Sequence, residues 1–156
     1  MPSYKGWSVE SAQAVIDSHA GEDGAMLPVL HDLQLTFGYI PRQAVPLVAD
    51  ALNVSRAEVH GVISFYHYFR ESPPGQHVLR LCRSEACQAL GATRVANYAR
   101  ARLGLDWHET TADGALTLEP VYCLGLCACG PSAMLDERPL ARLDEQRLDA
   151  LIEAAR

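Results

Sequence analysis

Five cysteines are the residues of this chain whose spacing indicates chemistry. They form two close pairs, Cys82-x4-Cys87 and Cys123-x3-Cys127, and Cys129 follows Cys127 after one intervening residue. Each close pair supplies two thiolates from one stretch of backbone, so two pairs are able to enclose a small metal centre. Structural zinc takes C-x2–4-C loops, whereas a [2Fe–2S] core is longer than a single ion and accepts wider, unequal loops. The spacing favours an iron–sulfur centre, with zinc second and disulfides last.

Composition excludes several other classes of protein. The 156 residues suffice for one domain or two small ones, and 49% hydrophobic content supports a packed core. A net charge of −6 makes nucleic acid a poor partner, since phosphate binding requires a basic face. No signal peptide and no run of about 18 apolar residues can be read, so we expect no membrane span. An odd number of cysteines without a signal peptide indicates a reducing, cytoplasmic location.

The first seventy residues are expected to form a bundle of short amphipathic helices. The helices are predicted over residues 9–19, 25–37, 41–52 and 55–69. Ser8 and the Ser55/Glu58 capping box begin two of them, and Gly38 ends the second. Pro41 is expected at the first helical position of the third helix, which Pro46 is expected to kink. We interpret this bundle as a scaffold and partner surface rather than a reaction site.

Ser72-Pro73-Pro74-Gly75 marks a domain boundary, after which the pattern changes. Residues 77–81 alternate like a strand and lead into Cys82. The remaining predicted elements are a helix over 88–103 with Leu90 on its buried side, strands over 107–111, 116–122, 133–135 and 140–143, and a closing helix from the Asp144 cap through 152. This order predicts a small α+β layer in which both cysteine pairs lie in loops at strand ends.

Two stretches of the chain resemble a known family. They are residues 60–70 (HGVISFYHYFR) and residues 109–125, which end in Leu118-Glu119-Pro120-Val121-Tyr122-Cys123-Leu124-Gly125. Both are similar to the thioredoxin-like [2Fe–2S] subunit of respiratory complex I. That subunit pairs with the NADH-oxidising flavoprotein. The same module occurs in NAD-reducing hydrogenases and in NAD-dependent, molybdenum-containing formate dehydrogenases. The resemblance covers most of the chain, including both cysteine pairs.

Within this group the chain resembles the gamma subunit of NAD-dependent formate dehydrogenase. The similarity rests on Cys82-Arg83-Ser84-Glu85-Ala86-Cys87 and on residues 123–131 (CLGLCACGP). Cys129 departs from the complex I branch, whose last ligand is usually followed by a stretch without an extra cysteine. We expect Cys129 to pack beside the centre and not to ligate it. The equivalent subunit of complex I or of a NAD-reducing hydrogenase stays open as an alternative, with a zinc-binding interaction module more remote.

The resemblance implies that residues 73–156 form a thioredoxin-like [2Fe–2S] domain, in which Cys82, Cys87, Cys123 and Cys127 ligate one cluster. Burying the negative charge of that cluster requires hydrogen-bond donors, and we expect them to be the backbone N–H groups around Gly125 and Ala128. We expect residues 1–72 to form a helical bundle that docks the partner, because one helix cannot bury the closely spaced aromatic residues Phe65, Tyr66, Tyr68 and Phe69. FMN, NAD and the molybdenum cofactor belong to partner subunits: an FMN- and NAD-binding flavoprotein and, through it, a catalytic subunit with molybdenum and iron–sulfur centres. No catalytic site is expected on this chain. We interpret His60 and His67, seven residues apart, as helix-packing or partner contacts.

Overall fold

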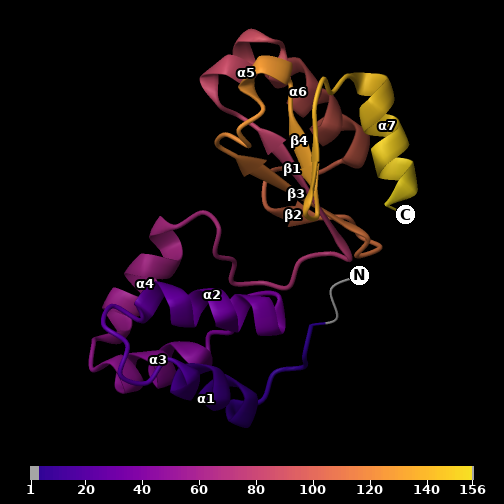
Figure 1. The fold of residues 1–156 in the computed structure, drawn as a ribbon. Coiled ribbons are helices and arrows are strands. Elements are labelled where there is room, and N and C mark those ends of the chain that lie inside the picture. The colour runs from indigo at the N-terminus through magenta and orange to yellow at the C-terminus, as the bar shows by residue number, and fades with distance from the viewer. Residues whose placement is uncertain (1–3, 156) are drawn as a thin grey trace. The chain divides into compact units, whose positions relative to one another are not determined.

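The computed structural model describes residues 4–155, which divide into two compact units that meet in the sequence between Pro73 and Pro74. The described part of the N-terminal unit consists of helices and loops, and the C-terminal unit combines a sheet with helices (Figure 1). This mixture confirms the predicted α+β fold class.

The four helices of the N-terminal unit begin and end at local sequence signals. They are α1 (Val9–Ser18), α2 (Met26–Phe37), α3 (Ala44–Leu52) and α4 (Arg56–Phe65). The Ser8 hydroxyl accepts a hydrogen bond from the Ser11 N–H, and Ser55 and Glu58 form the predicted capping box. Gly38 ends α2 in the left-handed conformation with φ 83°, which costs a residue without a Cβ little.

The third helix starts later than predicted, so that its proline lies in the first turn. Residues 41–43 form a turn, in which the Ala44 N–H donates to the Pro41 carbonyl at 2.8 Å. Pro41 therefore precedes the helix, and Pro46 is its third residue. In the first turn of a helix the backbone N–H has no intrahelical partner, so a proline there removes no hydrogen bond.

The fourth helix ends at Phe65 rather than reaching residue 69. Tyr66 is extended (φ −88°, ψ 107°), so His67 lies beyond the helix and does not share a helix face with His60. The segment after α4 is held instead by the buried side chain of Gln34. Its amide donates to the Tyr68 carbonyl at 2.8 Å and accepts from the Arg70 N–H at 2.8 Å.

A charged network joins α1 to α2 through His19. Its ring nitrogens lie 2.8 Å from Glu22 Oε2 and 3.0 Å from Asp32 Oδ2, and its side chain is 13% exposed. Two carboxylate partners require both ring nitrogens to donate, which is possible only in the imidazolium form. The hydrogen bonds to Glu22 and then Asp32 raise the pKa of His19 above 6.5. The bond to His19 correspondingly lowers the pKa of Asp32.

We expect this network to make the stability of the protein depend on pH. Because the pKa of His19 is raised in the folded state, its contribution is complete below about pH 6.5 and is lost as the pH rises through the folded pKa. Thermal unfolding between about pH 5.5 and about pH 8.5 should show this loss. In His19→Gln the fall should be smaller, and an NMR titration should place the wild-type His19 pKa above 6.5. Equal pH dependence in wild type and His19→Gln would contradict the assignment.

The C-terminal unit is built on a five-stranded mixed sheet with the order β2-β3-β1-β4-β5. Its strands are β1 (His77–Cys82), β2 (Glu109–Thr110), β3 (Leu116–Val121), β4 (Ala133–Leu135) and β5 (Arg138–Leu140). The central strands β1 and β3 run parallel with Cys82 opposite Val121, and the other pairs are antiparallel. Parallel pairing brings the carboxyl ends of β1 and β3 to the same edge of the sheet.

Helices α6 (Ala92–Leu103) and α7 (Glu145–Ala154) pack on one face of this sheet. The core between them includes Leu79 and Leu81 of β1, Ala99 of α6 and Leu148 of α7, each less than 4% exposed. Asp144 caps α7 as predicted by accepting from the Arg147 N–H at 2.8 Å. The sheet and its helices thereby form a rigid base for the loops that carry the cysteines.

Three predictions for this unit were wrong. The helix expected over 88–103 is split into α5 (Glu85–Ala89) and α6, because Gly91 between them has φ 94° and cannot continue a right-handed helix. Leu90, expected to be buried, lies at this break and is 52% exposed. The second strand of the last hairpin is β5, earlier than the predicted 140–143, because Asp136 in the left-handed region (φ 54°) allows a tight turn.

Along the chain from residue 4 to residue 155, none of the helices is both long enough and apolar enough to cross a bilayer.

Candidate metal centre

The first cysteine pair lies at the carboxyl end of β1. Cys82 is the last residue of the strand, and Cys87 lies in α5, which begins after Ser84. The two side chains are buried, with exposed fractions of 2% and 1%. A strand that runs into a short helix thus directs both thiols inward.

The second pair lies in the loop after β3. Cys123 adopts φ 83°, and Cys127 begins a 3-10 helix, Cys127–Cys129. Their sulfur atoms are 3.5 Å apart, and both side chains are exposed. Two thiolates bound tetrahedrally to one metal at about 2.3 Å stand about 3.8 Å apart. The spacing of this pair is therefore close to that of two ligands of one metal atom.

Backbone hydrogen bonds tie the two cysteine loops together. The Arg83 N–H donates to the Val121 carbonyl at 2.7 Å, and the Cys82 N–H donates to the Ser132 carbonyl at 3.0 Å. These bonds extend the β1–β3 pairing beyond the strands and join β1 to the segment after Cys129. The parallel strands thus bring both sequence-predicted pairs to one edge of the sheet.

The thiols influence one another electrostatically. Burial opposes ionisation of Cys82, but hydrogen bonds from Ser84, from the Cys87 thiol and from the backbone at Cys123 lower the pKa of Cys82 to about 6. The pKa of Cys127 is raised, first by its hydrogen bond to Cys123 and by the negative charge of the Cys123 thiolate. The charges of Cys87 and Cys82 raise it further. A thiolate is the form that ligates metal. The four sulfur atoms therefore influence one another, and metal ions bound between them would relieve the repulsion between their thiolates.

Three donors reach the sulfur atoms. The hydroxyl of Ser84 lies 3.2 Å from Cys82 Sγ, that of Ser132 lies 3.4 Å from Cys87 Sγ, and the Gly125 N–H donates to Cys123 Sγ at 3.4 Å. Gly125 has φ 75°, which favours glycine, and Ala128 is an exposed residue of the 3-10 helix. Neither serine was predicted from the sequence to contact a thiol. Ser84 could have been found as the helix cap beside Cys82, whereas Ser132 is 45 residues from Cys87.

The donor set fits a two-metal sulfur cluster. Two pairs of thiols come from two loops, and one pair is at the spacing of ligands to one metal atom. Among residues 4–155 no three Cys, His, Asp or Glu side chains converge on a single metal position. Cys129 is half-buried and its backbone is fixed, since its N–H donates to Leu126 at 2.9 Å and its carbonyl accepts from Arg142 at 2.8 Å.

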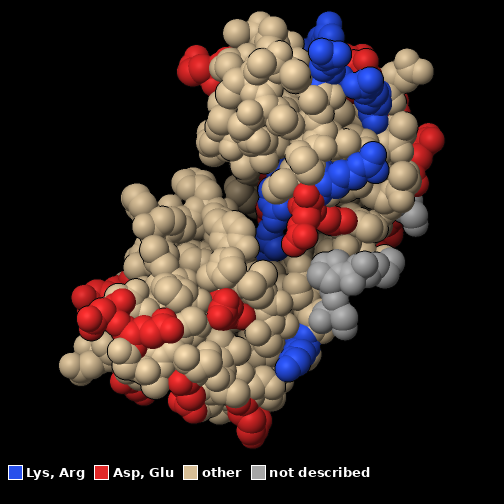
Figure 2. Space-filling view, in the orientation of Figure 1, with Lys and Arg blue, Asp and Glu red and all other residues tan. Residues whose placement is uncertain are grey.

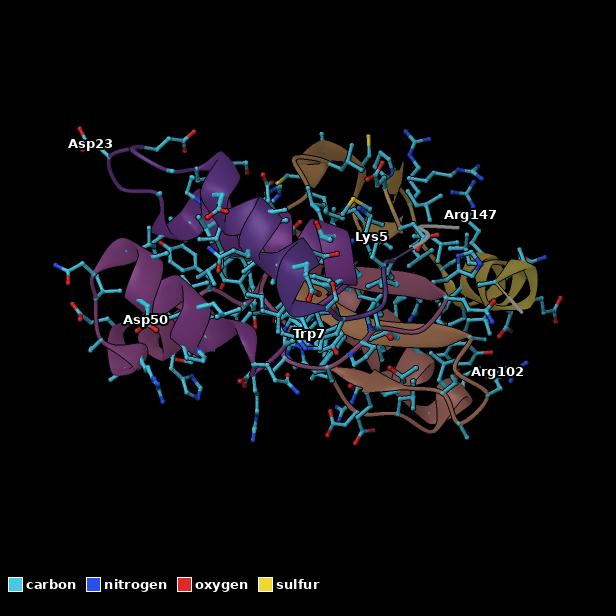
Figure 3. The ribbon with its side chains drawn as sticks, turned by 90° about the horizontal axis from the view of Figure 1, so that it is seen from below. Lys5, Trp7, Asp23, Asp50, Arg102 and Arg147 are labelled. Atoms are coloured by element: carbon cyan, nitrogen blue, oxygen red, sulfur yellow. The ribbon has the colours of Figure 1, made fainter. Side chains whose placement is uncertain are left out.

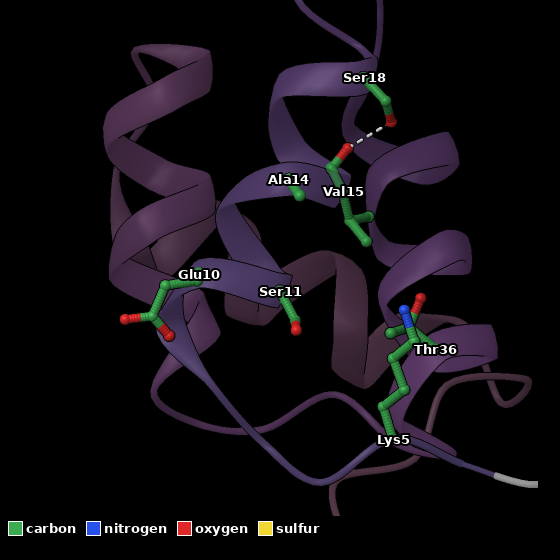
Figure 4. Close-up of a pocket in the computed structure, with 7 residues that line it drawn as sticks. All are labelled: Lys5, Glu10, Ser11, Ala14, Val15, Ser18 and Thr36. Atoms are coloured by element: carbon green, nitrogen blue, oxygen red, sulfur yellow. Dashed lines mark hydrogen bonds between the residues drawn. The ribbon is translucent and has the colours of Figure 1, made fainter.

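A cavity of about 380 Å³ in the N-terminal unit has a different character (Figure 4). It opens between α1 and α2, and its lining includes Lys5, Glu10 and Ser18, but no cysteine or histidine. The Ser18 hydroxyl is already bonded to the Val15 carbonyl at 2.6 Å. Nothing in this lining resembles a reaction centre, so the thiols remain the candidate site.

Comparison with known proteins identifies the family of this chain. Residues 12–156 match the family of the thioredoxin-like [2Fe-2S] ferredoxins. NADP-reducing hydrogenase subunit HndA from Solidesulfovibrio fructosivorans is 35% identical over 123 residues, covering 79% of this chain and 72% of that protein. A subunit of the NADH-quinone oxidoreductase from Escherichia coli (strain K12) is 34% identical over 139 residues, covering 88% of this chain and 84% of that protein. The crystal structure of an air-oxidized NAD+-reducing [NiFe]-hydrogenase is similar with a TM-score of 0.70 and 28% identity, over 84% of this chain but only 22% of that longer chain.

Proposed function

The chain belongs to the thioredoxin-like [2Fe–2S] ferredoxin family, and from this membership we propose that Cys82, Cys87, Cys123 and Cys127 hold its one [2Fe–2S] cluster. The observation that carries the proposal is the meeting of both cysteine pairs at the carboxyl ends of the parallel strands β1 and β3. When bound, the cluster supplies one-electron transfer.

The residues around the thiols have separable roles. Cys82 and Cys87 hold the buried side of the centre, where the hydroxyls of Ser84 and Ser132 donate to their sulfur atoms. Cys123 and Cys127 hold the exposed side, where electrons exchange with a partner over the shortest path. Hydrogen bonds to ligand sulfur stabilise the more negative, reduced form of such a centre, so these donors favour reduction.

The relatives are subunits of NADH-quinone oxidoreductases and NAD(P)-reducing hydrogenases, so an electron-transfer role in a multisubunit oxidoreductase is well supported. Within that class we favour a NAD-dependent formate dehydrogenase in the cytoplasm. Support comes from the first ligand loop, Cys82-Arg83-Ser84-Glu85-Ala86-Cys87, and from Cys129, which resemble the gamma subunit of that enzyme. The chain then exchanges electrons with the FMN of a NAD-binding flavoprotein. The names of the relatives keep complex I and NAD-reducing hydrogenase as the second candidate.

The N-terminal unit has an exposed surface suited to docking that flavoprotein. Its aromatic patch, defined here as Phe65, Tyr66 and Tyr68, is 73%, 41% and 48% exposed. The Phe65 and Tyr66 rings are 5.1 Å apart, and Tyr68 stacks on His31 at 5.6 Å. Because these rings support one another and Gln34 fixes the backbone below Tyr68, the patch is ordered before a partner arrives. Exposed aromatic side chains that are already ordered are typical of interface cores.

Charge indicates the character of the docking partner. Residues 4–73 contain eight Asp and Glu and four Lys and Arg side chains, which give a formal net charge of −4 (4 − 8) when the histidines are counted as neutral. Figure 2 shows acidic side chains gathered on this unit, and Figure 3 shows Asp23 projecting outward from it. An acidic unit with an exposed aromatic patch favours a partner that has an apolar pocket and basic side chains. We infer that the flavoprotein supplies this pocket.

Purification of the tagged chain from the cells that make it tests the parent complex. We expect a reddish-brown preparation that contains a flavoprotein and a molybdenum-containing chain and that reduces NAD with formate. The chain alone should turn over neither formate nor NADH, because it lacks a dinucleotide-binding G-x-G-x-x-G fingerprint. Recovery of quinone-reducing or nickel–iron hydrogenase chains in place of the molybdenum subunit would select the second candidate. A colourless preparation with one zinc per chain would reject the cluster itself.

A further inference from the structure

Arg83 has a fixed backbone between the two cysteine loops. It follows Cys82 directly, and its N–H donates to the Val121 carbonyl at 2.7 Å. Its own carbonyl accepts from the Gln88 side chain at 2.7 Å. Arg83 is thereby tied to the strand end that leads to Cys123 and to the helix that carries Cys87. Its side chain starts from an immobile point beside both pairs.

The guanidinium of Arg83 is held by an aromatic ring. Its Cζ lies 5.5 Å from the centroid of the Trp107 ring, within the range of a cation–π interaction. Its Nε is buried and has no hydrogen-bond partner. Within residues 4–155 no carboxylate forms an ion pair with it. The positive charge of Arg83 is therefore partly desolvated and not neutralised by a neighbour.

Arg100 and Asp106 hold the Trp107 ring in place, and their opposite charges neutralise each other. Arg100 of α6 lies 5.9 Å from the same ring centroid, and its Nη2 is 2.9 Å from Asp106 Oδ1. The Asp106 carboxylate also accepts a hydrogen bond from the backbone N–H of Trp107 at 2.6 Å. Arg100 and Asp106 thus form a neutral pair that positions the indole, and Arg83 is left as the net positive charge of the group.

We propose that Arg83, held in place by Trp107, raises the reduction potential of the [2Fe–2S] centre. This inference rests on the proposed function of the four thiols. The thiolates and the core they hold carry a formal charge of about −2, which becomes about −3 on reduction. A fixed cation in a partly desolvated position stabilises the more negative state more strongly than the less negative one. Glu85, the acidic residue of the same loop, is exposed, so solvent screens its opposite effect.

A redox titration of the purified full-length chain, followed by visible absorbance and by the EPR signal of the reduced centre, tests the proposal. Arg83→Gln should shift the midpoint potential to a more negative value. Arg83→Lys should keep most of the wild-type potential, because the charge remains. Trp107→Leu should shift the midpoint in the same direction by a smaller amount, since Arg83 is then free to move into solvent.

Arg138→Gln is the matched control, since it removes the same charge from the other end of the sheet. Arg138 pairs with Leu135, which lies opposite Leu79, away from the carboxyl end of β1. The proposal would be overturned if Arg83→Gln and Arg138→Gln had equal midpoint potentials. It would also be overturned if Arg83→Lys shifted the midpoint as far as Arg83→Gln does. If Arg83→Gln does not retain its centre, an unchanged midpoint in Trp107→Leu overturns it instead. Failure of the proposed function is distinct, because the wild-type chain would then lack a [2Fe–2S] spectrum.

Discussion

Serine in place of Cys82, Cys87, Cys123 or Cys127 is expected to remove the [2Fe–2S] cluster from the purified protein. Loss of a residue that only hydrogen-bonds to a metal ligand already lowers metal affinity by about 10–100-fold. Loss of a thiolate ligand itself should weaken cluster binding at least as much. The effect should be greatest at Cys82 and Cys87, because a serine there buries a hydroxyl where the site has a thiolate. Iron and acid-labile sulfide per chain, together with visible absorbance, measure the outcome.

Cys129→Ser is the control for these variants. Cys129 belongs to the same 3-10 helix as Cys127, so its replacement perturbs the same loop. We expect this variant to keep its colour and two iron atoms per chain, as a [2Fe–2S] centre requires. Loss of iron in Cys129→Ser with retention in Cys127→Ser would show that the ligand assignment is wrong.

Disruption of the aromatic patch is expected to separate partner binding from cluster binding. In the double variant Phe65→Ser/Tyr68→Ser, affinity for the flavoprotein should fall by about ten-fold or more, since aromatic residues dominate the free energy of most interfaces. Both side chains are exposed, so their removal should leave the helical core intact. The variant should bind as much iron as the wild type. Co-purification with the tagged chain and a titration of the isolated partners measure the loss.

Val9→Ser provides the comparison within the same unit. Val9 is the first residue of α1 and is 53% exposed, but it lies outside the aromatic patch. Its replacement should leave flavoprotein binding unchanged. Full affinity in the Phe65→Ser/Tyr68→Ser variant would instead assign docking to the C-terminal unit, where Tyr122 beside Cys123 is 64% exposed.

Much of the local structure was predictable because short-range interactions determine it. The Ser55/Glu58 capping box, the Ser8 and Asp144 caps and the left-handed Gly38 each involve residues within four positions of one another. Where prediction failed, the backbone conformation of a single residue decided the outcome. Gly91 splits one expected helix into two, and extended Tyr66 ends α4 early. A 3.6-residue pattern of apolar side chains cannot reveal such breaks, because it continues on either side of them.

The amino-acid sequence alone reveals the groups available for chemistry and the local boundaries: two close cysteine pairs, the caps of the helices and the Pro-rich change of pattern near residue 73. How these parts meet depends on the tertiary fold. The parallel pairing of β1 with β3 sets Cys82 opposite Val121, two residues before Cys123. One cysteine pair is buried and the other is exposed. The antiparallel pairing of β4 with β1 brings Ser132 to Cys87, and the pairing of β3 with β2 and with β1 brings Trp107 to Arg83. These contacts join residues more than twenty positions apart, so they depend on strand pairing and core packing, which no local pattern of residues specifies.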